Sequence, residues 1–96
     1  MSPNKHIKLN KLRKDLDKLD TSLLKLIKKR TNIINKVIKQ KDFKKQIVDK
    51  KRINKILKKI RKKSIEINID PKITHRVWKN MIWSYIDYER RNFKKK

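Results

Sequence analysis

The 96-residue chain has no cysteine, glycine or alanine, and only 9 of its residues are acidic. Without cysteine it forms neither a disulfide nor a thiolate metal site. His6 and His75 have no partner at ligand spacing, so we expect neither a metal nor another cofactor. No apolar run approaches the roughly 18 residues that span a bilayer, and the N-terminal segment lacks the apolar core of a signal peptide. We therefore expect a cytoplasmic protein with no membrane association.

The shortage of acids leaves 32 lysines and arginines and a formal net charge of +23. A charge of this size attracts anions, nucleic acids included. The lysines are spread over every polar face and are not collected in one block, and few aromatic residues lie among them. We therefore expect a small dianionic metabolite as the ligand, and we keep a basic helical nucleic-acid-binding protein as the weaker alternative.

The rest of the chain is organised around the long stretch from Leu9 to Lys41. Apolar residues recur there at intervals of mostly three or four, as on one face of an α-helix, at Leu9, Leu12, Leu16, Leu19, Leu23, Leu26, Ile33 and Val37. Such a helix is roughly 48 Å long, whereas a compact protein of this size has a radius of gyration of about 12 Å. The remaining residues cannot cover the helix, so the pattern predicts an intertwined homodimer.

Two further helices follow a linker over residues 42–48, in which Phe43 and Ile47 can pack back. Asp49 can cap the second helix, and Asp70 with Pro71 can begin the third. The apolar face of the second helix reads Ile53, Ile56, Leu57, Ile60 and Ile67, and the inner face of the third reads Thr74, Val77, Trp78, Met81, Ile82, Tyr85 and Glu89.

No segment has the alternating pattern of a β-strand. The expected fold class is therefore all-α, a three-helix subunit with a very long first helix. We place one helical domain over residues 9–93, a disordered tail over residues 1–8 and a basic tail over residues 94–96.

Arg30 and Lys41 occupy positions where the stripe of the first helix calls for an apolar residue. They are related by about 20° of rotation and roughly 16 Å of rise, so both can reach a small anion between them. No acid shares their face, and the sequence leaves open whether the anion is on another helix or on a ligand. Arg13 lies about 25 Å further along the helix and can enter only the pocket of a partner chain. The spacing thus predicts two equivalent pockets, each lined by both chains.

Arg52 and Glu89 are two further candidates. Only seven of the basic residues are arginines, and a guanidinium forks onto carboxylates in a way that lysine cannot. Arg52 lies near the apolar face at the start of the second helix. Glu89 continues the apolar face of the third helix, four residues after Tyr85. A buried carboxylic acid, when protonated, is a hydrogen-bond donor.

Together these residues resemble the all-helical bacterial chorismate mutase family. The resemblance covers about residues 9–93 and rests on Leu12-Arg13, Leu19-Asp20, Leu26, Arg30, Lys41, Asp49, Arg52, Ile69-Asp70, Arg76-Val77-Trp78 and Met81-Ile82. It implies an intertwined dimer that rearranges chorismate to prephenate in the shikimate pathway of aromatic amino-acid biosynthesis, without a cofactor.

The resemblance also implies a role for each candidate. Arg30 and Arg13 of the partner subunit would bind the substrate carboxylates, and Lys41 would donate to the ether oxygen and a carboxylate. Arg52 would lie on the same pocket wall with Asp49 beside it. Glu89 stands where the bacterial enzymes usually carry Gln. A Glu there is similar to the fungal enzymes, and it donates to the ether oxygen only when protonated.

One position departs from the family pattern. Ile53 stands where a Glu normally contacts the ring hydroxyl of chorismate. An apolar residue there resembles the isochorismate-pyruvate lyase branch, which forms salicylate and whose third helix is similar to Met81-Ile82 and Tyr85-Ile86. We count Ile53 and Tyr85 among the substrate-binding residues, and the substrate stays open between chorismate and isochorismate.

Overall fold

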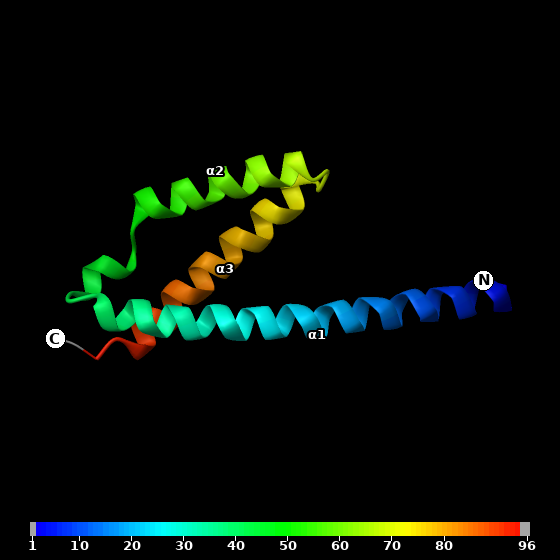
Figure 1. Cartoon of the computed structure of the whole chain (residues 1–96), viewed down its shortest axis with the longest axis horizontal. Coiled ribbons are helices and arrows are strands. Elements are labelled where there is room, and N and C mark those ends of the chain that lie inside the picture. The colour runs from blue at the N-terminus through cyan, green and yellow to red at the C-terminus, as the bar shows by residue number, and fades with distance from the viewer. Residues whose placement is uncertain (1, 95–96) are drawn as a thin grey trace. The chain divides into compact units, whose positions relative to one another are not determined.

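The computed structural model describes residues 2–94, which form three α-helices and one short 3-10 helix (Figure 1). These elements are α1 (Pro3–Gln40), η1 (Lys44–Ile47), α2 (Lys50–Glu66) and α3 (Pro71–Asn92). No strand occurs within residues 2–94, so the predicted all-α class with a very long first helix is confirmed. None of the helices in this range is long and apolar enough to cross a membrane.

The chain divides into two compact units, one ending at Ile33 and the other beginning at Ile34. The boundary falls inside α1, and therefore within the single domain predicted over residues 9–93. Each unit is described by itself in the paragraphs that follow.

The first unit is helical from Pro3, so the prediction of a disordered tail is wrong for residues 3–8. The Ser2 hydroxyl accepts a hydrogen bond from the backbone N–H of Lys5 at 3.3 Å, and Pro3 occupies the first helical position. A serine cap followed by a proline is a strong helix start, because the cap satisfies a free N–H and proline has none to lose. Met1 lies outside the described residues.

The apolar stripe of the first unit faces solvent in the single chain. Between 54 and 66% of each residue is exposed at Leu12, Leu16, Leu19, Leu23, Leu26 and Ile33. Single exposed leucines are ordinary, but a row of them along one helix, interrupted only at Arg30, is a surface that needs a partner. The first unit thus has an apolar face and no core of its own.

The core lies in the second unit, where α3 packs against α2 and η1. Its buried centre is formed by Ile47, Ile82 and Ile86, each no more than 7% exposed. The half-buried side chains that pack around this centre are Val48, Ile53, Ile56, Leu57 and Phe93. Ile38, near the end of α1, is also buried. Part of each predicted apolar face therefore lies in the core, namely Ile53, Ile56 and Leu57 of α2 and Ile82 of α3.

The segment between α1 and α2 is more ordered than the predicted linker. The Gln46 side-chain oxygen accepts hydrogen bonds from the backbone N–H groups of Asp42 at 2.7 Å and Phe43 at 2.8 Å. This turn buries Ile47, as predicted, but leaves Phe43 exposed, so the prediction that Phe43 packs back is wrong. The Phe43 ring instead lies 5.6 Å from the Lys45 ammonium.

Both predicted helix caps are confirmed. The Asp49 carboxylate accepts from the backbone N–H of Arg52 at 3.0 Å, and the Asp70 carboxylate accepts from that of Lys72 at 2.9 Å. Each cap satisfies an N–H that has no partner within the helix. Pro71 is the first residue of α3.

The tight turn between α2 and α3 depends on Asn68, whose φ is 61°. The N–H of Ile69 reaches the Ser64 carbonyl at 2.8 Å, and the N–H of Asn68 reaches the Ile65 carbonyl at 3.2 Å. These two bonds define a Schellman motif, in which asparagine supplies the left-handed residue that this glycine-free chain needs. Because α2 ends at Glu66, Ile67 is exposed and not part of the apolar face, contrary to prediction.

A hydroxyl pair holds the turn end of α2 against α3. Ser64, 3% exposed, shares a 2.7 Å hydrogen bond with Thr74 and donates to the Ile60 carbonyl at 2.6 Å. Val77 is half exposed, so its predicted place on the inner face of α3 is wrong, and Ile86 is buried on that helix. The helical rotation from Trp78 back to Val77 is about 100°, which carries Val77 off the packed face.

Candidate active site

A partly buried ion pair joins Lys41 to Glu89. Lys41 directly follows the last residue of α1, and its Nζ lies 3.0 Å from Oε1 of Glu89 on α3. The Glu89 side chain is 7% exposed and that of Lys41 is 21% exposed. The anion that the sequence left unassigned for Lys41 is therefore a carboxylate on another helix. An ammonium has three N–H groups, so Lys41 keeps donors for a ligand beside Glu89.

Two tyrosines on α3 flank this pair. The Tyr88 hydroxyl donates to Oδ1 of Asn35 on α1 at 2.7 Å, which ties the last turns of α1 to α3. Tyr85, four residues before Glu89, lies edge-on to Tyr88 with ring centroids 6.4 Å apart. The Tyr88–Asn35 bond thus joins the helix that precedes Lys41 to the helix that carries Glu89, and the candidate substrate-binding Tyr85 lies on the same helix face as Glu89.

An open cavity of about 550 Å³ adjoins Lys41. It is lined by Lys41, Gln46, Val48, Asp49, Lys50 and Lys51. Three of these side chains are ammonium groups and one is a carboxylate, so the lining is net positive and suits an anionic ligand. The predicted site residues Lys41 and Asp49 thus meet at one cavity.

Asp49 and Arg52 lie together at the start of α2. The Asp49 carboxylate is both the helix cap and part of the cavity wall, whereas the Arg52 side chain is exposed. The hydrogen bond between them uses the backbone N–H of Arg52, so its guanidinium is not the group that pairs with Asp49. Arg52 is not among the residues that line the cavity, so its place on the same wall stays a prediction.

Ile53 is half buried and packs against the core cluster of Ile47, Ile82 and Ile86. An isoleucine completes the apolar packing there and offers no hydrogen-bond acceptor. This gives a structural reason for the departure from the family pattern, since the side chain contributes to the core of the second unit.

Arg13 and Arg30 belong to the first unit, apart from the other predicted site residues. Arg30 is half buried on α1, while Arg13 is exposed on the same helix. Both lie within an unbroken α-helix, as the spacing argument requires. A pocket that brings these two arginines together with Lys41 and Glu89 is part of the proposed function.

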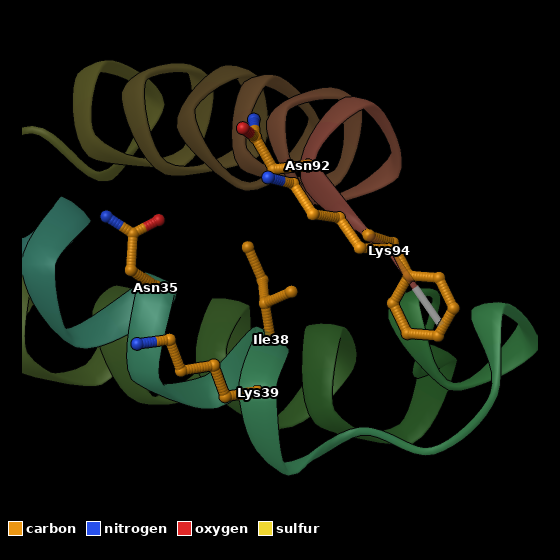
Figure 2. A pocket seen from close by; sticks show the side chains of 6 residues that line it. Asn35, Ile38, Lys39, Asn92 and Lys94 are labelled. Atoms are coloured by element: carbon orange, nitrogen blue, oxygen red, sulfur yellow. The ribbon is translucent and has the colours of Figure 1, made fainter. Parts of the chain in front are cut away.

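A second cavity, of about 370 Å³, lies between the last turns of α1 and the end of α3 (Figure 2). Figure 2 shows Asn35, Ile38 and Lys39 on one side and Asn92 and Lys94 on the other. It contains none of the predicted site residues. Lys94 is the one described residue of the predicted basic tail, since residues 95 and 96 lie outside the described range.

Three residues of the cavity wall were not predicted from the sequence, namely Gln46, Lys50 and Lys51. The hydrogen bond between Asn35 and Tyr88 was not predicted either. The signal for the two lysines was present, because side chains that follow an N-cap surround the start of the helix. Gln46 and Asn35 left no comparable signal, since both are polar residues whose partners become evident only from the fold.

The fold and the site define an all-helical protein with an open cavity of net positive lining, in which Lys41 also pairs with Glu89. Residues 12–90 match the family model described as chorismate mutase type II, and the chain belongs to that family. The search of curated proteins and the search of solved structures each found no match.

Proposed function

We propose that the protein is a chorismate mutase, which rearranges chorismate to prephenate in cytoplasmic aromatic amino-acid biosynthesis. The observation that carries the proposal is the Lys41–Glu89 pair, which is 3.0 Å long and partly buried, and whose lysine lines a positively charged cavity. The membership of residues 12–90 in the chorismate mutase type II family supports it.

The reaction is an intramolecular rearrangement in which a carbon–oxygen bond breaks as a carbon–carbon bond forms. It needs no nucleophile, because the enzyme folds the enolpyruvyl arm over the ring and stabilises charge on the ether oxygen. In our proposal Arg30 and Arg13 of the partner subunit hold the two carboxylates. Arg52 and Asp49 line the wall of the same pocket.

Lys41 and Glu89 act on the ether oxygen. Lys41 donates to it with an N–H that Glu89 does not use, and protonated Glu89 supplies a second donor. Preorganised donors of this kind stabilise developing charge because they need no reorganisation during the reaction. In the structure Glu89 accepts from Lys41, whereas the proposed role needs the acid form of Glu89, which can donate.

The complete pocket requires a homodimer in this proposal. The exposed row from Leu12 to Ile33 supplies the apolar surface for a second copy of the chain. Fully burying one such side chain contributes about 1.5–3 kcal/mol, so the whole row can stabilise an obligate dimer. Arg13 lies within this row and would be delivered to the partner's pocket when the two first helices pair.

The test is to incubate the purified protein separately with chorismate and isochorismate and to identify the products. We expect prephenate from chorismate at a rate that Lys41→Ala abolishes. The control is Lys45→Ala, which removes a lysine that precedes the lining residue Gln46 in sequence but is not itself part of the lining. Turnover that persists in Lys41→Ala contradicts the proposed site, and inertness toward both substrates contradicts the proposed activity.

Isochorismate-pyruvate lyase activity is the second candidate. The observation that favours it is the packing of Ile53 into the core, because an acceptor for the ring hydroxyl of chorismate is then absent from that position. In this alternative the same cations bind isochorismate, and elimination of pyruvate leaves salicylate. The incubation with isochorismate separates the two candidates by its product.

A further inference from the structure

A third cavity lies at the other end of the α2–α3 pair, beside the turn that joins the two helices. Its volume is about 320 Å³, and its lining is Arg61 of α2 with Pro71, Lys72, His75 and Arg76 of α3. It has no lining residue in common with the cavity at Lys41. It is therefore a separate feature that the proposed reaction does not use.

Every side chain around this cavity except that of Pro71 is basic. Lys72, His75 and Arg76 are three and four residues apart, so they share one face of α3, and Arg61 comes from the neighbouring helix. No acidic residue lines the cavity. Within residues 2–94, none of these four side chains has a hydrogen-bond or ion-pair partner.

Cations gathered without an anion repel one another, and a bound anion relieves that repulsion. Asp70, one residue before Pro71, is not part of the lining, and its carboxylate accepts from the backbone N–H of Lys72 as the cap of α3. That cap also occupies the start of α3, so a ligand here would be held by side chains and not by the helix terminus.

The kinds of donor favour an oxyanion with several equivalent oxygens. Two guanidinium groups, one on each helix, can each fork onto a pair of oxygens, and Lys72 adds a point charge. A tetrahedral phosphate accepts from several directions at once, whereas a lone carboxylate satisfies one fork. We propose that this cavity binds a phosphate group, either as inorganic phosphate or as the end of a phosphate monoester.

The experiment follows the backbone amide resonances of the whole protein as inorganic phosphate is added at pH 7 and constant ionic strength. We expect saturable shifts at Arg61, Lys72, His75 and Arg76, with sodium chloride as the ionic control. The double variant Arg61→Gln/Arg76→Gln lacks both guanidinium groups. It should bind phosphate about tenfold or more weakly, as expected for the loss of charge-assisted hydrogen bonds.

The matched control is Lys58→Gln/Lys62→Gln, which removes the same charge from exposed positions of α2 outside the cavity. This control should bind phosphate like the parent. Equal weakening in both double variants, or shifts that never saturate, would overturn the proposal, because either result means general attraction to a basic protein. Since Arg61 and Arg76 are outside the proposed catalytic machinery, this outcome is independent of mutase activity.

A second arm uses glycerol phosphate to identify the source of the phosphate group. Tighter binding of glycerol phosphate than of inorganic phosphate assigns the cavity to a monoester, and the reverse order assigns it to the free ion. A third arm uses a short DNA duplex. If both double variants weaken DNA binding equally and phosphate binding does not saturate, the proposal is wrong. The cavity would then be part of an extended basic surface that attracts nucleic acid, and not a discrete phosphate site.

Discussion

Glu89 accepts a hydrogen bond from Lys41 in the structure, whereas the proposed reaction needs it to donate one to the ether oxygen. Only the acid form of the carboxyl group carries a proton to donate. The rate should therefore fall as the pH rises and the acid loses its proton.

Glu89→Gln should remove this pH dependence. The amide supplies a permanent N–H donor, and its carbonyl oxygen still accepts from Lys41. We expect kcat/KM of the variant to stay flat toward alkaline pH and to equal or exceed that of the parent there. Asp87→Asn, the same kind of change at an exposed carboxylate on α3, is the control. A flat parent profile with a slower variant at every pH would refute the proposed role of Glu89.

Ile53→Glu should alter both substrate preference and stability. A carboxylate at this position can accept from the ring hydroxyl of chorismate, so the ratio of mutase to lyase activity should rise. The same change removes an apolar side chain from the core cluster, which should lower the free energy of unfolding by on the order of 1–3 kcal/mol. Product analysis and urea denaturation measure the two effects. An unchanged ratio in a folded variant would mean that residue 53 does not face the substrate.

At the scale of single elements, the caps of α2 and α3 can be compared directly. Asp49 and Asp70 make the same bond to a backbone N–H, at 3.0 and 2.9 Å, but only Asp49 lines the cavity at Lys41. Changing either one to alanine should lower the free energy of unfolding by about 0.5–2 kcal/mol.

Only Asp49→Ala should also lower kcat/KM, because it alone removes part of the proposed substrate wall. Urea denaturation and steady-state kinetics on the two variants make the comparison. If both variants lose activity equally, the effect of Asp49 is purely structural.

The helix starts at Asp49 and Asp70 were predictable because capping is a local property of two or three neighbouring residues. The start of α1 was missed because residues 3–8 lack apolar periodicity, and the Ser2–Pro3 cap was overlooked. Val77 and Ile67 were misplaced because apolar spacing alone does not show where a helix ends or how wide its packed face is.

The site was predictable to the extent that it depends on helical spacing. Glu89 falls on the inner face of α3 by counting from Tyr85, and Lys41 falls on the stripe by counting from Val37. That they pair with each other was not predictable, because 48 residues separate them and only the packing of α3 brings them together. The Asn35–Tyr88 bond, across 53 residues, was hidden for the same reason.

For the whole molecule, the exposed row of leucines predicts that folding and association are coupled. The apolar face of the first unit has no core of its own, so a folded monomer should not persist. We expect the midpoint of thermal unfolding to rise with protein concentration, as mass action requires of an obligate dimer. Sedimentation over a dilution series provides the direct measurement. A helical species of 11.8 kDa at working concentration would contradict it.

A shared pocket predicts that two inactive variants restore activity when mixed. In the homodimer of either variant, Arg13→Ala or Arg30→Ala, each pocket lacks one of its two arginines. A heterodimer of the two has one pocket with both arginines, so random exchange should leave about a quarter of all pockets intact. Activity after denaturation and joint refolding tests this, with each variant refolded alone as control. If heterodimers form and remain inactive, the two arginines do not serve one pocket.

The exposed row of leucines also has a consequence for how ions act on the molecule. Pairing two rows brings together two chains that each carry a formal charge of +23, so the apolar attraction must overcome long-range repulsion. The Debye length shrinks from about 10 Å at 0.1 M to about 3 Å at 1 M, which weakens that repulsion without weakening the apolar contact. Salt therefore acts on this protein in two opposite directions. In the proposed dimer, salt should favour the joining of the subunits and disfavour the binding of the anionic substrate.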